Sequence, residues 1–523
     1  MNMRRLPPSW FTQLGSRVSD RKLCPVFCMR HGFNPCNCRR TASYSKLHQN
    51  NRYQKRFIHH TSRPVFSGPD SVENPRLAPL QVTSILRVNE LSVDVNEGAV
   101  KYFESNQLQS NNPIEDRRGN AKFVGSPRFL FGVFDGHAGC ACAQAISERL
   151  YYYIALMISP PHLIEKIVHL LKDRGLDIHS TGILNWYRGA HDYVNKELSP
   201  MYSKSLVKLA NEILALYIEE ESTIDDHLLS AFCRLDQDIV QEALPNYSKN
   251  VSNFEAMQIA FSGSCACVAM VDGINLYVAN TGDCKAVLGV NVGDDQWEAK
   301  ELSHDHNADN VQECRRLVNS HPNEGTHLIR NGRLLGDLAP LRAFGDVRYK
   351  WPARELKHVV KTMAYSTPYG NNLIPAHYHT PPYLTAEPEL ISRRLTPKDK
   401  FLVLATDGLW EMVTPEKVVK IIAGHMEGQQ VHVNFRLPYS EITLSNINQI
   451  LLKRKTSLAN KAEDSNAATH LIRNALGPEH GRVSAMLTLP IHISRLYRDD
   501  ITVTVVYFDT DYIRDHFHQT SGD

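Results

Sequence analysis

The sequence predicts an α+β fold, and three observations support this prediction. Short apolar segments bounded by glycine, aspartate and asparagine recur along the chain and indicate β-strands. Elsewhere, apolar residues recur every three or four positions, as on one face of a helix. Hydrophobic residues make up 42% and charged residues 22% of the 523 residues, which is typical of a globular protein. No run of about 18 apolar residues occurs, so we expect no membrane-spanning helix.

The first predicted strand is RFLFGVFD, residues 128–135, which ends at the turn pair Asp135-Gly136. A helix is expected to follow over about 142–157, where apolar residues recur at helical spacing. The pattern of residues 159–227 predicts a mostly helical insert with polar interruptions and no evident chemistry. Residues 228–244 then predict another amphipathic helix.

The second half of the chain adds further strands. Residues 263–290 predict two strands folded about Asp272-Gly273, which is a hairpin signal. The segment KFLVLATD, residues 400–407, predicts another strand that ends in an Asp-Gly pair, and a helix follows over 418–426. Residues 427–465 predict a polar surface excursion. The alternating pattern of 501–508 predicts the last strand, which two acids precede.

The first 63 residues differ from the rest of the chain in charge. They contain 13 lysines and arginines and a single acid, Asp20, whereas residues 64–523 hold 45 basic and 55 acidic residues. Such a basic segment without a long apolar core predicts a mitochondrial transit peptide over about 1–63. The alternative is a basic arm that contacts nucleic acid or membrane. Four cysteines in this segment (Cys24, Cys28, Cys36 and Cys38) are interpreted as incidental and not as a zinc site.

Acidic residues stand at the ends of the predicted strands. They are Asp135, Asp283, Asp407, Asp499 and Asp500, with the pair Glu115 and Asp116 as a further addition. A single Asp-Gly pair is commonly a simple turn. Five or six acids at strand ends instead indicate carboxylates that converge on one point, where like charges need cations to neutralise them. Ligand sets of oxygen atoms without histidine or cysteine favour Mg²⁺ or Mn²⁺.

His137 follows the first of these acids by two positions. A single histidine is more often structural than catalytic, but beside a metal site its near-neutral pKa suits it to deliver a proton to a leaving group. Gly136, between them, allows a backbone carbonyl to approach a metal closely because it has no side chain. Two metals roughly 4 Å apart can share a water and orient it for in-line attack on phosphorus. The pattern therefore predicts a metal-dependent phosphohydrolase.

Nine segments resemble, in the same order, those of the metal-dependent type 2C protein serine/threonine phosphatases. They are IEDRRG, FGVFDGH, FSGSCACVAMV, VANTGDCKAVL, LSHDHN, LLGDLAPLRAFGD, LTAEPEL, FLVLATDGLWEMV and RDDITVTVV. The resemblance covers about residues 104–510, which leaves 64–103 as an N-terminal extension and 511–523 as a C-terminal tail. Further segments, among them FESNQL, YHTPPYLTAEPE and RLYRDDIT, resemble the branch of the family that acts on the pyruvate dehydrogenase complex.

The resemblance implies a four-layer α/β/β/α sandwich, in which helices flank two mostly antiparallel sheets and two Mg²⁺ or Mn²⁺ ions lie at one edge between the sheets. It also implies the site residues. By this resemblance, Asp135 bridges both metals, the carbonyl of Gly136 binds one of them, and Asp407 and Asp499 bind the other. Glu115 acts through metal-bound water, with Asp116 nearby, and His137 is the general acid. Asp283 and Glu411 stand, with Asp407, where a third metal can bind.

The sequence departs from the family pattern at three positions. Glu411 replaces the usual aspartate, which puts the third metal in question. Asp500 takes the place of an asparagine, so Asp499 is the expected ligand and Asp500 the alternative. Asn111 stands where an arginine commonly binds phosphate, and asparagine offers neither a charge nor a bidentate fork. The neighbouring Arg117 or Arg118 can substitute for that arginine, or the pair can simply face solvent.

The implied reaction is hydrolysis of protein phosphoserine without a covalent phosphoenzyme. The implied substrate is the phosphorylated decarboxylase component of the pyruvate dehydrogenase complex, in the mitochondrial matrix. Docking to the lipoyl domain of the acetyltransferase core and pairing with a regulatory subunit are also implied, with no nucleic-acid partner. Two alternatives remain open, a phosphatase of the same type acting on another matrix protein and a metal-free pseudophosphatase that only binds. The intact set of predicted metal ligands argues against the second.

Overall fold

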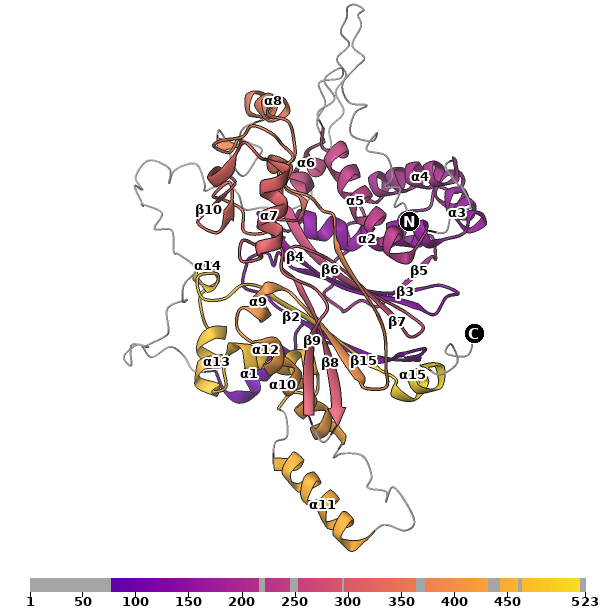
Figure 1. Cartoon of the computed structure of the whole chain (residues 1–523), viewed down its shortest axis with the longest axis vertical. Helices are drawn as coiled ribbons and strands as arrows, with labels where there is room; N and C mark the ends of the chain where they lie inside the picture. Colours follow the sequence, from indigo (N-terminus) through magenta and orange to yellow (C-terminus); the bar gives the residue numbers. More distant parts are fainter. Residues whose placement is uncertain are drawn as a thin grey trace, which may run out of the picture. The chain divides into compact units, whose positions relative to one another are not determined.

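Two β-sheets pack face to face between two layers of helices, as the computed structural model shows (Figure 1). The structure describes residues 77–215, 222–244, 253–293, 296–363, 372–430, 443–459 and 463–517. All of them belong to one compact unit, Ser62–Asp523. The predicted transit peptide and its four cysteines lie outside the described residues. The expected four-layer α/β/β/α sandwich is confirmed.

The first sheet has six strands in the order β1-β2-β15-β14-β8-β9, and all neighbouring strands are antiparallel. These strands are β1 (Leu91–Glu97), β2 (Val100–Leu108), β15 (Ile501–Phe508), β14 (Asp399–Ala405), β8 (Lys285–Gly293) and β9 (Gln296–Glu301). The last strand of the chain thus lies beside one of the first. This pairing brings the C-terminal acids to the same edge as the N-terminal ones.

The second sheet follows the order β13-β7-β6-β4-β3-β5, again antiparallel throughout, and β12 also pairs with β6. Its strands are β13 (Glu389–Arg394), β7 (Asn275–Thr281), β6 (Gly263–Asp272), β4 (Arg128–His137), β3 (Arg117–Phe123), β5 (Leu184–Trp186) and β12 (Phe344–Gly345). The predicted hairpin about Asp272-Gly273 is confirmed, because Asp272 pairs with Asn275 and Gly273 adopts a φ of +59°.

Both faces of β4 are buried, which explains its nearly continuous apolar sequence. Phe129, Phe131 and Val133 point into the core between the sheets, whereas Leu130 and Phe134 belong to the core beneath the helices. Successive side chains of a strand point to opposite faces, so a strand between two buried layers needs apolar residues at almost every position. A charge at the end of such a strand, as at Asp135, therefore requires a specific environment.

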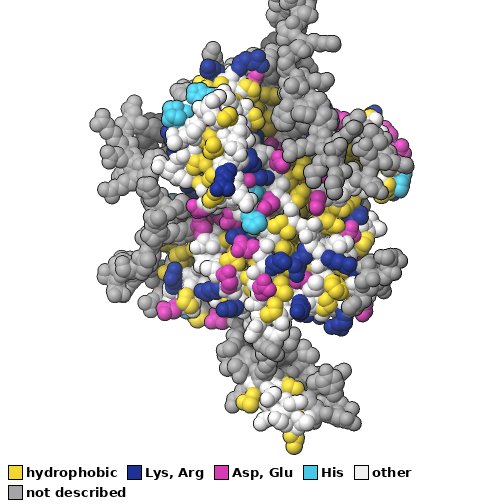
Figure 2. Space-filling view, viewed as in Figure 1, with side chains coloured by type: hydrophobic (Ala, Val, Ile, Leu, Met, Phe, Trp, Pro, Cys, Tyr) yellow, Lys and Arg dark blue, Asp and Glu magenta, His cyan; other side chains and the backbone are white. Residues whose placement is uncertain are grey.

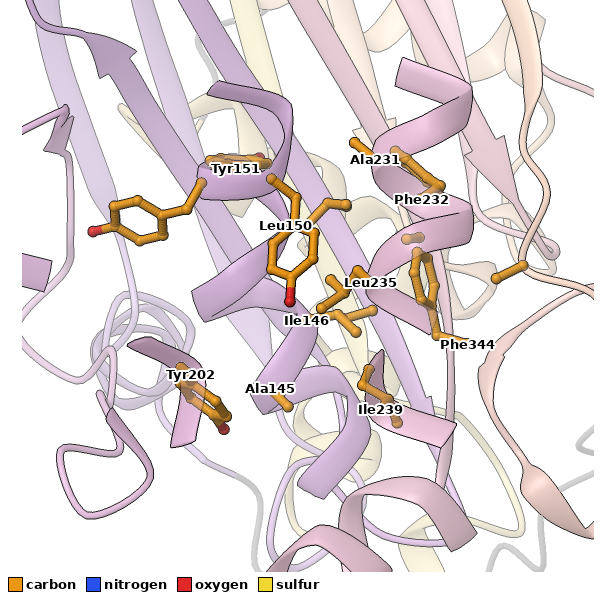
Figure 3. Close-up of a cluster of buried hydrophobic side chains, with 14 of the residues drawn as sticks. Ala145, Ile146, Leu150, Tyr151, Tyr202, Ala231, Phe232, Leu235, Ile239 and Phe344 are labelled. Carbon is orange, nitrogen blue, oxygen red and sulfur yellow. The ribbon is translucent and has the colours of Figure 1, made fainter. Parts of the chain in front are cut away.

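One helical layer covers the second sheet and contains α2 (Ala141–Ile158), α4 (Ser199–Ala215), α5 (Ile224–Glu242) and α6 (Phe254–Phe261). Ile146 and Leu150 of α2 point toward Leu235 and Ile239 of α5 (Figure 3). The other layer covers the first sheet and contains α1 (Pro79–Leu86), α10 (Pro415–Gln430), α12 (Ala467–Leu476) and α13 (His480–Leu487). Both predicted helices at 142–157 and 228–244 are present, with shifted ends.

The remaining elements connect these layers. They are α3 (Pro161–Val168), a π-helical turn (His169–Asp173), 3₁₀ turns (Ile178–Ser180, Gly325–His327 and Val347–Tyr349), α7 (Val311–Ser320), the hairpin β10 (Ile329–Arg330) with β11 (Arg333–Leu334), α8 (Ala353–Met363), α9 (Asp407–Trp410), α11 (Leu444–Ala459), α14 (Ile491–Ser494) and α15 (Thr510–Phe517). Among the described residues, no helix is both long and apolar enough to span a membrane.

The structure differs from the sequence prediction in several segments. The insert 159–227 contributes strand β5 to the edge of the second sheet. Residues 263–290 form three strands and not two, because the chain turns at Gly282 (φ +101°) and β8 joins the first sheet. The excursion 427–465 contains α11, on which Leu444 and Leu451 are exposed. Figure 2 shows hydrophobic side chains on the surface of this helix. The extension 64–103 holds α1, β1 and the start of β2, and the tail begins within α15, whose Ile513 is buried. These segments lack the clear periodicity on which the prediction depended.

A buried ion pair ties the helical layer together. The guanidinium of Arg149 on α2 is fully buried, lies 2.7 Å from Glu242 Oε1 at the end of α5, and stacks on Tyr202 at 4.6 Å. We expect Glu242→Ala to lower the free energy of unfolding by about 3–5 kcal/mol, because the buried arginine then keeps its charge without the carboxylate that pairs with it and retains only the hydroxyl of Tyr153. Urea denaturation of the two proteins measures this difference, and a loss below about 1 kcal/mol contradicts it.

Candidate active site

Strand ends of both sheets deliver the predicted site residues to one edge. Asp135 to His137 end β4, where Asp135 pairs with Cys265 and His137 with Gly263 of β6. Asp407 is the first residue of α9, directly after β14, and Asp499 lies two residues before β15. Asp283 lies in the turn between β7 and β8. Because β14 and β15 are neighbours in one sheet and β4 and β6 in the other, residues more than 360 positions apart meet.

The charges of these acids act on one another. Burial raises the pKa of Asp135 well above its ordinary value, and the charges of Asp407, Asp116 and Asp283 raise it further. Burial likewise raises the pKa of Asp407, and the negative charges of Asp283 and Asp499 raise it further. The buried Oδ2 of Asp135 has no hydrogen-bond partner within the described part of the chain. Oxygen donors of this kind are the ligands that Mg²⁺ and Mn²⁺ prefer, and such cations would neutralise the repulsion among the acids. As the side chains stand, no three acidic, histidine or cysteine residues of the described part of the chain are grouped closely enough to hold an ion.

Asp116 lies near this cluster, and two hydroxyl groups hold its carboxylate. Its Oδ2 accepts hydrogen bonds from Thr406 Oγ1 at 2.8 Å and from Thr502 Oγ1 at 2.7 Å. Burial and the charge of Asp500 raise its pKa. These bonds connect the loop before β3 to the ends of β14 and β15. Asp116 thereby positions the two strand ends that carry Asp407 and Asp499.

Asp499 and Asp500 have different environments. Asp500 is buried, and its carboxylate accepts bonds from the backbone N–H groups of Ser110, Asn111 and Glu115 at 2.5, 2.8 and 2.7 Å. It therefore organises the loop that carries Glu115. Asp499 accepts the N–H of Asp500 and the amide of Asn111 on its Oδ1 alone, and its charge raises the pKa of Asp407. This difference favours Asp499 over Asp500 as a ligand.

The expectation that Asn111 contacts phosphate does not fit its surroundings. Its amide nitrogen donates to Asp499 Oδ1 and Asp500 Oδ2, each at 3.0 Å, and the residue is buried. The nitrogen is the amide's only donor, so a phosphate oxygen would have to displace a carboxylate. Asn111 instead holds the two aspartates in place.

Three further acids surround the cluster. Glu115 accepts the Gly139 N–H at 2.6 Å, and burial raises its pKa while that bond and Arg495 lower it in part. Asp283 accepts the Cys265 thiol at 3.1 Å. Glu411 is exposed at the end of α9, and its charge contributes to the raised pKa of Asp407. All three thus belong to the same electrostatic cluster.

His137 has a partner that the sequence alone did not identify. Its Nε2 lies 2.6 Å from Oδ2 of Asp346, which is fully buried in the loop after β12. Burial lowers the pKa of His137, but the charge and hydrogen bond of Asp346 outweigh this effect and raise it. A Cβ on Gly263 would lie 2.1 Å from both paired atoms, so the pair requires glycine there. In the sequence, Asp346 is marked only by its place at the end of the segment LLGDLAPLRAFGD.

The glycines of the two Asp-Gly pairs at the site, Gly136 and Gly408, lie too close to neighbouring backbone for a side chain to fit. A Cβ on Gly136 would lie 2.3 Å from the carbonyl oxygen of Glu115, and one on Gly408 would lie 1.9 Å from that of Asp500. Backbone atoms cannot move aside at such distances, so each glycine allows two acid-bearing segments to approach closely. Close backbone approach therefore explains both glycines without reference to a metal.

Two further histidines and the two arginines of the first acidic motif have structural roles. His306 is buried, accepts the Gly282 N–H through Nδ1 at 3.1 Å, and burial lowers its pKa to about 4. His304 pairs with Glu389 at the surface. Arg117 donates from Nη1 to the carbonyls of Ile114 and Asp116, and the buried Arg118 pairs with Asp192 at 3.1 Å. These bonds direct the Arg118 guanidinium to Asp192 and hold two of the three guanidinium nitrogens of Arg117, which also donates through Nε to Gln144.

Comparison with known proteins identifies the family. The family model described as Protein phosphatase 2C matches residues 192–465. Human pyruvate dehydrogenase (acetyl-transferring) phosphatase 1, mitochondrial, is 44% identical over 453 residues, with 83% of each chain covered. Human phosphatase 2 of the same name is 42% identical, with 84% of each chain covered. A serine-threonine phosphatase 2C structure from Toxoplasma gondii aligns with a TM-score of 0.41 and 17% identity over 80% of this chain and 99% of that one. The chain belongs to the protein phosphatase 2C family and is a protein serine/threonine phosphatase.

Proposed function

We propose that this phosphatase removes phosphate from serine of the decarboxylase component of the pyruvate dehydrogenase complex and thereby reactivates the complex. Identities of 44% and 42% to two human enzymes named for this substrate support the proposal. Both relatives are named mitochondrial, and the basic N-terminal segment agrees with import. The proposed compartment is the matrix. Proposed partners, from the family resemblance, are the lipoyl domain of the acetyltransferase core and a regulatory subunit.

The proposed cofactors are two Mg²⁺ or Mn²⁺ ions, since the family is metal-dependent in general. Asp135, the carbonyl of Gly136, Asp407 and Asp499 would hold them, with Glu115 acting through water. Asp283 and Glu411 are the proposed holders of a weaker third ion. The unpartnered Oδ2 of Asp135 within a cluster of mutually repelling acids is the observation that supports this assignment most. When bound, such ions supply an activated water for attack on phosphorus and neutralise the developing charge.

Within this proposal, His137 delivers a proton to the departing serine oxygen. The alkoxide of serine is a poor leaving group, so protonation as the bond to phosphorus breaks lowers the barrier. Asp346 holds the imidazole through Nε2, which leaves Nδ1 as the nitrogen that can face the substrate. In this proposal Asp116 holds the ends of β14 and β15 together, Asp500 holds the loop that carries Glu115, and neither transfers a proton.

Phosphate release from the phosphorylated decarboxylase tests this function. The full chain is assayed with Mg²⁺, with EDTA, and with Mg²⁺ restored, beside an unrelated phosphoserine protein. We expect release to fall at least about a hundredfold in EDTA, to return with Mg²⁺, and to be faster on the decarboxylase. Equal rates of phosphate release from the two proteins would support the phosphatase activity and contradict the decarboxylase as its preferred substrate. No release by folded protein in Mg²⁺ would support a pseudophosphatase.

A further inference from the structure

The site must bind a phosphate dianion, yet the groups nearest to it are acids. Asn111 is bonded to two aspartates, and Arg117 and Arg118 are held elsewhere. Arg498 is buried, with 5% of its surface exposed, so substrate does not reach it. Beside the proposed metal ions, an accessible cationic side chain at this edge would further attract the phosphate group and orient it.

Arg495 is such a cation. Its side chain is 61% exposed, and its Nη2 lies 3.9 Å from Oε2 of Glu115. That distance is too long for a hydrogen bond. Among the described residues, no hydrogen bond holds the guanidinium, and its charge lowers the pKa of Glu115. Its N–H donors remain available to a ligand at the active-site edge.

The backbone fixes the place of Arg495. It caps the C-terminus of α14, and the preceding Ser494 is buried and donates through Oγ to the carbonyl of Ser110 at 2.7 Å. Ser110 directly precedes Asn111. The turn that carries Arg495 is thus anchored one residue from the position where the chain lacks an arginine. A guanidinium from the C-terminal part of the chain can therefore supply the charge that position 111 does not.

We propose that Arg495 binds the phosphate group of the substrate phosphoserine. A guanidinium presents two parallel N–H donors that match two phosphate oxygens, and such charge-assisted pairs are among the strong hydrogen bonds of proteins. The weak contact with Glu115 gives way as phosphate enters, and the long side chain needs only rotamer changes to reach it. This inference rests on the proposed function and adds a substrate-binding residue to it.

The test compares Arg495→Ala and Arg495→Lys with the wild-type full chain in Mg²⁺. We expect the alanine variant to raise the KM for a phosphoserine peptide roughly tenfold to a hundredfold and to change kcat less than about threefold. The inhibition constant of inorganic phosphate rises by a similar factor, because this probe contains no peptide. In Arg495→Lys we expect the KM and the inhibition constant to lie between those of the wild type and the alanine variant, because lysine keeps the charge and loses the bidentate geometry.

Arg514→Ala is the matched control. Arg514 is similarly exposed, at 56%, but it lies on α15 at the opposite end of β15, and we expect its kinetics to match the wild type. An unchanged phosphate inhibition constant in Arg495→Ala would overturn the proposal even if the peptide KM rose, because Arg495 would then bind the peptide. A loss confined to kcat, with altered Mg²⁺ dependence, would also overturn it by giving Arg495 a role on Glu115.

Failure of this inference can be distinguished from failure of the proposed function. If the wild-type chain releases no phosphate from any substrate, the function fails, and calorimetric titration with inorganic phosphate then tests the site directly. Binding that is about tenfold weaker in Arg495→Ala supports the site. Equal binding by both proteins overturns it.

Discussion

Replacing Asp135 by asparagine is expected to lower kcat on a phosphoserine substrate by at least about a thousandfold, because a proposed ligand of both metals loses its charge. The same substitution is expected to raise the melting temperature in EDTA. Burial and neighbouring acids raise the pKa of Asp135, so its ionised form destabilises the metal-free protein above the ordinary pKa of aspartate. Asparagine removes this repulsion, and the gain vanishes below about pH 4.

Opposite changes in activity and stability separate this result from misfolding. Kinetics in Mg²⁺ and thermal melts in EDTA and in Mg²⁺ measure both, and we expect Mg²⁺ to stabilise the wild type more than the variant. Asp272→Asn is the control, because Asp272 lies at the far end of the same β4–β6 ladder and pairs with Arg128. Equal metal-induced stabilisation of wild type and Asp135→Asn would count against Asp135 as a ligand.

The second large effect depends on the leaving group. We expect His137→Ala to slow hydrolysis of phosphoserine by about 10²–10⁴-fold, because the serine oxygen then departs without a proton. On p-nitrophenyl phosphate the loss is expected to be below about tenfold, since that phenolate departs readily without one. Steady-state kcat on the two substrates measures the contrast, and Mg²⁺-induced stabilisation is expected to stay unchanged.

Asp346→Asn separates holding the histidine from protonating the leaving group. Asp346 is bonded to His137 at 2.6 Å and does not reach the substrate, so we expect a smaller loss, about tenfold to a hundredfold, with the same dependence on the leaving group. In the double variant the losses are expected not to multiply, because both act through one proton donor. Multiplying losses, or equal losses on both substrates, would contradict the pairing.

The sequence predicted those parts of the fold whose signals are local. Strand β4 is a run of apolar residues that ends in a turn pair, α2 shows regular helical spacing, and the hairpin about Asp272-Gly273 has the expected turn residues. The three-residue strand β5 has too few residues for a period. Helix α11 has a weakly apolar sequence, so it was predicted as a polar excursion.

The candidate site divides in the same way. Their positions at the ends of predicted strands identify Asp135, Asp283, Asp407 and Asp499 from the sequence alone. The sequence did not reveal that Asp346 pairs with His137, because 209 residues separate them and neither flanking pattern indicates contact. It also did not reveal that the amide of Asn111 is already bonded to two carboxylates.

By itself, the sequence determined the main strands and helices with clear local patterns, the acids at the ends of those strands and hence the class of chemistry, because residue type and spacing set local conformation and available ligands. Only the tertiary structure decided which of these groups meet. Sheet pairing places β15 between β2 and β14. As a result Asp500 organises the Glu115 loop, the charge of Asp499 acts on Asp407, and Arg495 lies beside Glu115. Such contacts depend on how strands far apart in sequence align, and no local pattern encodes that alignment.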